Sequence, residues 1–254
     1  MKSAATYTRL LLKEWVPSIL FVVLLTQVGV AATRVDGVSM MPGLRNNEEV
    51  IIPKLEGWAH RFGLGTYHRG DIVVFKPPRA AASEWKRDVH GVPLPWAYRP
   101  YLIKRVIGVA GDHIRIDAGQ VSINGHLLNA HWTQDFWRAQ GCLDTTSAEA
   151  NTAVTGLFPN APATRTLTVP AGSLFVMGDN RSPGGSLDSR YFGTVPLADV
   201  AGRALLSVWP IVRNAQATAL CFSPDPKSSV TTSGPSELNL RVLNAPASFA
   251  DLGK

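Results

Sequence analysis

The chain has 254 residues, a formal net charge of +6 and a hydrophobic fraction of 45%. This length allows one large domain or two small ones, and this hydrophobic fraction is sufficient for a sizeable core. The lysines and arginines are scattered, and no run of them alternates with aromatic residues. The charge pattern therefore argues against nucleic acid as a partner.

An uncharged apolar segment lies near the start of the chain, at residues 15–33. At about 1.5 Å per residue it just spans a hydrocarbon core of about 30 Å. Residues 1–14 carry three basic side chains, which favours a cytoplasmic location for them. We predict a single-pass transmembrane signal anchor in the plasma membrane, in contact with lipid, with the rest of the chain on the extracytoplasmic side. Two alternatives are a signal peptide cleaved after Ala32 and a buried core helix.

The pattern after the apolar segment is mainly β. Apolar or alternating runs bounded by Gly, Pro and Asn predict strands. Asn124-Gly125 is the strongest hairpin signal in the chain. Residues 79–100 are expected to form an irregular loop with a short helical turn, and residues 129–165 are polar with little periodicity. The expected strands fall at 50–52, 70–78, 101–112, 113–117, 120–123, 166–170, 173–177 and 205–209.

These strands predict an antiparallel, two-part β-sheet or barrel-like catalytic domain. We divide it into a discontinuous core at 34–112 and 174–212 and an inserted β subdomain at 113–173. From residue 213 to 254, Ser, Pro and Thr dominate, which predicts a loosely ordered tail.

Two short stretches carry the candidate chemistry. Ser39 lies in Val35-Asp36-Gly37-Val38-Ser39-Met40-Met41-Pro42, just after the apolar segment, and Lys104 lies in an apolar run. A serine hydroxyl needs a neighbouring base, and a lysine can serve only when burial lowers its pKa from about 10.4. Strand alternation puts Lys104 and Arg105 on opposite faces. We hypothesise that Ser39 is the nucleophile and Lys104 its general base; the alternative is a lysine at a strand edge with its tip in water.

Other catalytic and binding patterns are weaker. His113 beside Asp112 could suggest a Ser-His-Asp triad, but adjacent strand residues point to opposite faces. Cys142 and Cys221 fit no metal pattern, and the sequence leaves open whether they form a disulfide or stay unpaired. We therefore expect no metal or other cofactor, and the oligomeric state is left open.

Four blocks together resemble the bacterial type I signal peptidases, which are membrane-anchored serine proteases with a Ser-Lys dyad. The resemblance extends from the apolar segment to about Pro210 and keeps the family's order. Within the fourth block, Gly184-Gly185 makes the stretch before Ser186 longer than in the family. The blocks are 39–42, 70–75, 104–112 and 178–196.

The resemblance also implies supporting roles. Ser186 matches a serine that hydrogen-bonds the lysine amine and orients it. Asp188 matches an aspartate that shapes the site through arginines, for which Arg190 and Arg105 are the candidates. Gly37 stands where some relatives place a serine hydroxyl in the oxyanion hole, so the backbone N–H of the nucleophile would contribute more there.

The implied substrate is an exported preprotein whose signal peptide lies as an extended strand beside the dyad and is cut after small residues at −1 and −3. Alternatives are a specialised pilus or conjugation maturation peptidase of the same family and an inactive, anchored β-domain that binds peptides. A self-cleaving repressor shares the dyad but should also carry a DNA-binding domain. With Gly37, the candidate substrate-binding residues are Val35, Met40, Leu44, Leu102 and Ile103.

Overall fold

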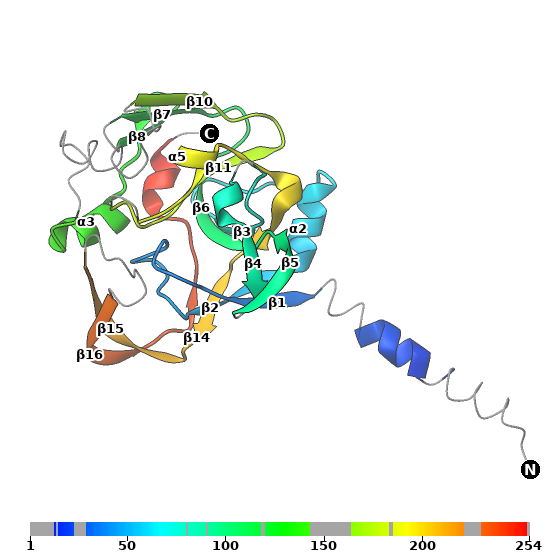
Figure 1. The fold of residues 1–254 in the computed structure, drawn as a ribbon. Coiled ribbons are helices and arrows are strands. Elements are labelled where there is room, and N and C mark those ends of the chain that lie inside the picture. The colour runs from blue at the N-terminus through cyan, green and yellow to red at the C-terminus, as the bar shows by residue number, and fades with distance from the viewer. Residues whose placement is uncertain are drawn as a thin grey trace, which may run out of the picture.

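The protein is described here by a computed structural model, which places residue 13 and residues 15–22, 29–79, 81–89, 91–117, 120–142, 164–182, 185–220 and 230–252. Its body is mainly β and built from antiparallel sheets (Figure 1). The mainly β, antiparallel fold class predicted from the sequence is thus confirmed.

A five-stranded sheet in the order β12-β11-β6-β3-β13 forms the centre of the body. All four residues of β3 and the last five of β6 are buried, so these stretches are covered on both faces of the sheet. One face of the sheet contributes Val73, Phe75 and Val106 to an apolar cluster, and the other contributes Ile107 and Phe175 to a second cluster. The strands are β3 (Ile72–Phe75), β6 (Leu102–Gly108), β11 (Ser173–Met177), β12 (Val195–Pro196) and β13 (Val200–Arg203).

Two four-stranded sheets flank the centre. One has the order β1-β2-β14-β17 and the other the order β10-β7-β8-β9. Asn124-Gly125 joins β8 to β9 with Ile123 opposite His126, so the predicted hairpin is confirmed. The strands are β1 (Val30–Arg34), β2 (Glu49–Pro53), β14 (Leu206–Trp209), β17 (Arg241–Val242), β7 (His113–Asp117), β8 (Gln120–Ile123), β9 (His126–Leu127) and β10 (Thr164–Thr168).

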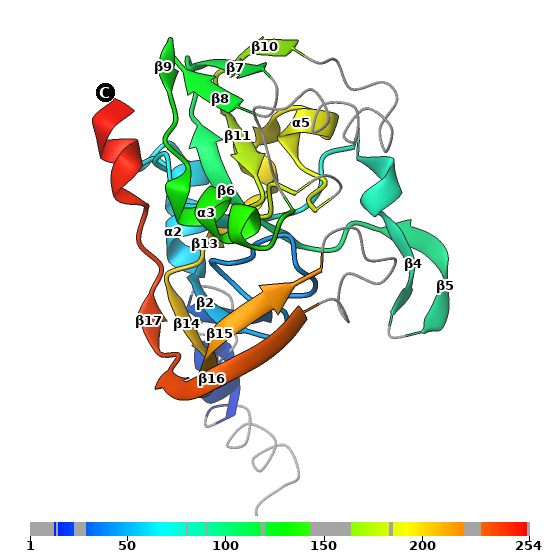
Figure 2. The ribbon, with the colours of Figure 1, turned by 90° about the vertical axis from the view of Figure 1, so that its left-hand side faces the viewer.

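Short helices and two separate hairpins complete the described elements. Figure 2 shows the β15–β16 hairpin and the β10-β7-β8-β9 sheet at opposite ends of the molecule. The helices are α2 (Lys54–Arg61), α3 (His131–Ala139) and α5 (Ser189–Phe192), with 3₁₀ turns η1 (Ala82–Glu84), η2 (Leu197–Asp199) and η3 (Ala247–Leu252). The hairpins are β4 (Lys86–Val89) with β5 (Val92–Tyr98), and β15 (Val212–Ala219) with β16 (Val230–Leu238).

The apolar segment ends earlier than predicted. Residues 15–22 are helical, but residues 30–33 of the predicted anchor belong to β1, which pairs along its whole length with β2. The backbone of β1 gains five cross-strand partners there, which overrides the apolar pattern. Of the residues described, no helix combines the length and the apolar character needed to cross a membrane. The remainder of the predicted anchor lies outside the described residues.

The prediction of a loosely ordered tail is wrong for residues 213–220 and 230–252. β15 and β16 form a hairpin in which Thr218 and Thr231 share a hydrogen bond of 2.5 Å. Most side chains of this hairpin are partly or fully exposed, so it needs no apolar alternation and its composition resembles a loop. Residues 221–229 of the predicted tail lie outside the described part.

Two arginines of the C-terminal segment also form hydrogen bonds with a buried carboxylate in the body of the protein. Glu48, which is only 1% exposed, accepts hydrogen bonds from Arg213 at 3.0 Å, Arg241 at 2.9 Å and Ser207 at 3.2 Å. A buried carboxylate needs such partners. These contacts tie the C-terminal strands to the turn that precedes β2.

Two further segments are more regular than the sequence predicts. Residues 79–100, expected to be an irregular loop, contain η1 and the β4–β5 hairpin. Residues 131–139, within the stretch with little periodicity, form α3, whose Thr133 and Trp137 are buried. These tertiary contacts, which a local pattern does not reveal, stabilise α3. Residues 143–163 lie outside the described part.

Candidate active site

Ser39 lies on a turn between β1 and β2. Gly37 has φ +102°, a conformation that glycine adopts readily, and its N–H donates to Asn46 Oδ1 at 2.9 Å. On the other side of Ser39, Met40 and Met41 are fully buried. The turn is therefore held from both sides and presents the hydroxyl of a partly exposed serine.

Lys104 lies in the middle of the central sheet, on β6 between β3 and β11. Its Nζ donates to Ser39 Oγ at 2.7 Å, and the residue is only 4% exposed. Burial lowers its pKa to about 8, although the charges of Asp188 and Glu84 oppose that shift. Across the described part of the chain, no carboxylate forms an ion pair with this amine. Lys104 therefore loses its proton far more readily than an exposed lysine does.

The backbone of the nucleophile turn is fixed by the segment after β11. The N–H of Asn180 donates to the carbonyl oxygen of Ser39 at 2.9 Å. A Cβ at position 178 would lie 2.4 Å from that oxygen and 2.3 Å from Ser186 Oγ, so Gly178 permits this close approach. Among described residues, the N–H of Ser39 has no hydrogen-bond acceptor. It remains available to a ligand.

Ser186 lies in the cleft beside Lys104, but its hydrogen bond differs from the one predicted. Its hydroxyl donates to Asp188 Oδ2 at 2.8 Å, and within the described residues it has no hydrogen bond to the Lys104 amine. An ionised carboxylate can only accept hydrogen bonds, so the Ser186 hydroxyl is the donor in this contact. Ser186 therefore connects the wall of the cleft to Asp188 in this structure.

Asp188 is fully buried and bound on several sides. Arg190 donates to both of its oxygens at 2.8 and 2.9 Å, and the N–H of Gly178 donates at 2.9 Å. Burial alone would raise the pKa of Asp188, but the charge and hydrogen bonds of Arg190, with those from Gly178 and Ser186, lower it. This carboxylate therefore stays charged while it orients Ser186.

Arg105 has a different partner from the one considered. It donates to Asp179 at 2.8 and 2.6 Å and to the carbonyl of Gly70 at 2.8 Å, rather than to Asp188. A Cβ at Gly43 would lie 2.6 Å from the Asp179 carboxylate, so a glycine in the nucleophile turn leaves space for this pair. The side chain of Arg105 thus lies on the face of β6 opposite to that of Lys104, below the turn that carries Ser39.

A cleft of about 330 Å³ runs past the pair. Of the predicted substrate-binding residues, it contains Gly37, Leu102 and Ile103 together with Ser39 and Lys104. Sequence reasoning missed several of its residues, because they come from segments far apart in the chain: the end of β1, the turn that carries Ser39, β3, η1, the residue before β6 and the loop before α5. These are Thr33, Arg34, Asp36, Val38, Val74, Glu84, Tyr101, Gly185 and Leu187.

The remaining predicted pocket residues are corrected by the structure. Val35, Met40 and Leu44 are at most 2% exposed and pack in an apolar cluster with Val50 and Ile72. Their side chains point into the core because the turn around Ser39 must be anchored there. They support the floor of the site instead of lining the cleft.

Helix α3 also reaches the nucleophile turn, which the sequence did not predict. Trp137 Nε1 donates to the carbonyl of Met41 at 3.2 Å, and Thr133 Oγ1 donates to the carbonyl of Asp179. Cys142, just after the helix, is disulfide-bonded, and the only other cysteine of the chain is Cys221. Cys142 is therefore not the unpaired thiol that the sequence left open, and Cys221 lies outside the described residues.

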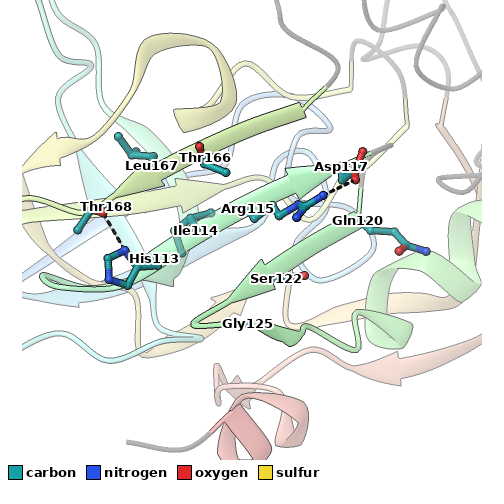
Figure 3. A pocket seen from close by; sticks show the side chains of 10 residues that line it. All are labelled: His113, Ile114, Arg115, Asp117, Gln120, Ser122, Gly125, Thr166, Leu167 and Thr168. Carbon is teal, nitrogen blue, oxygen red and sulfur yellow. Dashed lines mark hydrogen bonds and ion pairs between the residues drawn. The ribbon is translucent and has the colours of Figure 1, made fainter.

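A larger groove of about 680 Å³ lies elsewhere, over β7, β8 and β10 (Figure 3). His113 Nδ1 and Thr168 Oγ1 are 2.8 Å apart there, and Arg115 pairs with Asp117 at 3.1 Å. These groups are exposed and bind one another on a sheet face. Since His113 faces this groove, whereas the side chain that contacts Ser39 Oγ is that of Lys104, the triad alternative is not supported.

The part of the chain that the structure describes contains no group of three or more His, Cys, Asp or Glu residues suited to hold a metal ion. The cleft itself offers a serine hydroxyl beside a buried amine whose pKa is lowered to about 8 by that burial.

Antiparallel sheets with a serine next to a buried lysine resemble the arrangement in serine hydrolases that pair a serine with a lysine. The sequence matches the family described as signal peptidase, peptidase S26, over residues 8–209. Because this match covers most of the chain, the protein belongs to that family.

Individual relatives agree with the family. The chain is 34% identical over 169 residues to "Signal peptidase I V" of Bacillus subtilis (strain 168), covering 66% of this chain and 80% of that protein. It is 30% identical over 175 residues to "Probable signal peptidase I-2" of Synechocystis sp., covering 69% of this chain and 61% of that protein. The crystal structure of a signal peptidase I from Enterococcus faecalis V583 matches 55% of this chain and 97% of that chain at 28% identity, with a TM-score of 0.34.

Proposed function

We propose that this protein is a membrane-bound serine endopeptidase that removes N-terminal signal peptides from exported preproteins. The observation that carries the proposal is the 2.7 Å contact between Lys104 Nζ and Ser39 Oγ, with the amine buried and its pKa lowered by that burial to about 8. Membership of the signal peptidase family supports the same reaction.

The reaction proceeds through an ester. Neutral Lys104 accepts the hydroxyl proton while Ser39 Oγ attacks the scissile carbonyl carbon, and the oxyanion accepts a hydrogen bond from the Ser39 N–H. The ammonium of Lys104 then returns the proton to the departing amine, which becomes the N-terminus of the mature protein. Water, deprotonated by the same amine, attacks the ester and releases the signal peptide.

The cleft suits an extended substrate. Residues 33–39 form one wall and residues 101–104 another, so a strand between them could exchange main-chain hydrogen bonds with both. The cleft is lined by small and aliphatic residues such as Val38, Leu102 and Ile103 near the dyad. This supports a preference for small residues at −1 and −3 of the substrate.

Membrane attachment is the second part of the proposal. In the helical residues 15–22, Trp15, Ile19 and Phe21 are each more than half exposed, and Figure 1 shows the N-terminal helix leading away from β1. Exposed apolar side chains on such a segment favour lipid as their surroundings. Ala32 lies within the β1–β2 pairing, opposite Ile51, which favours a retained segment over one cleaved after Ala32.

Further apolar side chains are exposed close to this exit. Lys54, the first residue of α2, donates its N–H to the carbonyl of Gly29 at 2.9 Å, so α2 begins where the chain leaves the apolar segment. Trp58 is 47% exposed and Phe62 is 75% exposed. Both fit a position next to the bilayer on the extracytoplasmic side. Fractionation of cells should place the full chain with the membranes, and recovery in the soluble fraction would contradict this.

A cleavage assay tests the reaction. Purified full-length protein in detergent, with a synthetic precursor, should cut at one site, whereas Ser39→Ala and Lys104→Met should give no measurable product. Thermal unfolding of both variants controls for folding. Cleavage by either folded variant would refute the dyad. A panel of unrelated signal peptides would separate a general enzyme, which cuts several, from a pilus or conjugation peptidase that cuts one, and no cleavage at all would favour a peptide-binding role.

A further inference from the structure

The cleft contains a carboxylate, that of Glu84, which the proposed reaction does not use and which has no partner among the described residues. Four charged residues line it: Arg34, Asp36, Glu84 and Lys104. Arg34 pairs with Glu49 on the neighbouring strand at 2.9 Å, and Lys104 donates to the nucleophile. The carboxylate of Glu84, in contrast, has neither a hydrogen bond nor an ion pair with any residue that the structure describes.

The position of Glu84 places its charge where a substrate would pass. It is the last residue of η1, is partly exposed, and lines the same cleft as Tyr101 and Leu102 at the start of β6. Lys104 is two residues further along β6. A strand lying beside residues 101–104 would therefore carry one of its side chains past the Glu84 carboxylate.

The charge balance of the cleft is opposite to that of the whole chain. The protein has a net charge of +6. In the reactive form Lys104 is neutral, the charge of Arg34 is offset by Glu49, and Asp36 has an interaction of its own, so the carboxylate of Glu84 leaves the cleft acidic. Because this carboxylate has no partner among the described residues, a substrate cation would satisfy it.

We propose that Glu84 is a specificity-determining residue that favours a lysine or arginine side chain at the substrate position beside Tyr101 and Leu102, and disfavours an acidic one there. This inference rests on the proposed peptidase function. An exposed ion pair is modest, so the expected preference for Lys over Glu at that position is about three- to tenfold in kcat/KM at low ionic strength.

A second consequence follows from the field around Lys104. The carboxylates of Asp188, Glu84 and Asp179 favour the protonated amine, whereas Arg190 disfavours it. Removing the Glu84 charge should therefore lower the pKa of Lys104 and move the acid limb of the pH profile of kcat/KM to lower pH. A merely structural role for Glu84 would not produce this shift in that direction.

The test is a set of synthetic precursors cut by the full-length enzyme in detergent. Each peptide carries either Lys or Glu at one position near the cut, with small residues kept at −1 and −3. In the parent enzyme, one position should favour Lys, and the preference should shrink in high salt. In Glu84→Gln it should fall below twofold, and in Glu84→Lys it should reverse.

Glu237→Gln is the matched control, because Glu237 pairs with Arg213 on the β15–β16 hairpin and lies outside the cleft. It should leave the Lys-to-Glu ratio unchanged. The inference is overturned if no position distinguishes Lys from Glu, or if the ratio in Glu84→Gln equals that of the parent enzyme. If the parent enzyme cuts none of the peptides, including the unmodified one, the proposed function itself fails.

Discussion

Two neighbouring basic residues of β6, Lys104 and Arg105, lie on opposite faces of the strand and have different partners. Lys104 and Arg105 are each 4% exposed. The Lys104 amine faces the hydroxyl of Ser39 at 2.7 Å and no carboxylate of a described residue binds it, whereas Arg105 donates to both oxygens of Asp179 at 2.8 and 2.6 Å. One face therefore holds a base that can lose its proton, and the other holds a permanent ion pair.

The difference follows from the chemistry of the two side chains. A buried ammonium without a partner lowers its pKa and becomes neutral, while a guanidinium stays charged and requires a carboxylate. Burial near Ser39 thus produces an amine with a lowered pKa, and burial near Asp179 is accompanied by a charged pair.

The largest effect is expected from Lys104→Arg. This change keeps a cation on the same face of β6, but a guanidinium does not deprotonate at accessible pH. We expect kcat to fall by at least about 10²- to 10⁴-fold, the usual contribution of a general base, in the precursor-cleavage assay. Lys104→Met, which removes the charge, should be equally inactive. Activity above a tenth of the parent value in Lys104→Arg would contradict a neutral lysine as the base.

The ion pair on the other face is broken by Asp179→Asn. Arg105 would remain buried without its countercharge, and we expect the free energy of unfolding to fall by about 3–5 kcal/mol, measured by urea denaturation. The matched control is Asp135→Asn, because Asp135 pairs with Arg138 on the exposed surface of α3. The control substitution should lower the free energy of unfolding by less than about 1 kcal/mol. Equal losses in the two variants would show that burial of the Arg105 pair is not decisive.

The pH dependence reports on Lys104 directly. Its pKa is about 8 in the folded chain, below the ordinary 10.5, so kcat/KM should rise with pH through about 8 as the amine loses its proton. The unfolded chain binds more protons between these two values, so the free energy of unfolding should also rise with pH across that window.

The comparison with Lys104→Met isolates this contribution, because all other titrating groups are common to both proteins. The difference in unfolding free energy between the parent and the variant should change by about 3 kcal/mol from pH 8 to 10.5, with the parent gaining. A difference that stays constant over this window would mean that Lys104 titrates with an ordinary pKa.

The sequence predicted the elements whose chemistry is local. The strand around Lys104, the turn at Asn124-Gly125 and the antiparallel β class all follow from short patterns, and the structure contains them. The family blocks also predicted that Ser39 and Lys104 would act together, and their side chains lie 2.7 Å apart. Their catalytic roles stay predictions until the variants are assayed.

The sequence could not predict features that depend on contacts between distant segments. Val35, Met40 and Leu44 lie close to Ser39 in the chain, yet their side chains enter the core, because these apolar contacts hold the turn in place. Arg105 was considered as a partner for Asp188, but its partner Asp179 lies on the segment that follows β11. The β15–β16 hairpin has the composition of a loop and is stabilised by pairing that no local pattern records.

The smallest effect is expected from substitutions in helix α3, which contacts both the turn that carries Ser39 and the side chain of Arg105. Trp137 donates to the carbonyl of Met41 beneath Ser39, while the ring of Trp132 lies 6.0 Å from the guanidinium of Arg105. Trp137→Phe keeps most of the ring but removes one hydrogen bond, so we expect a loss of stability of about 1 kcal/mol and a kcat lower by a few-fold.

Trp132→Phe is the matched control on the Arg105 side. The indole N–H of Trp132 is buried without a hydrogen-bond partner among the described residues, so its removal forfeits no hydrogen bond. We expect kcat to change by less than twofold, because the nucleophile turn is not touched. If the two variants lowered kcat equally, α3 would act on the site through general stability, and the support of the Ser39 turn by Trp137 would have to be abandoned.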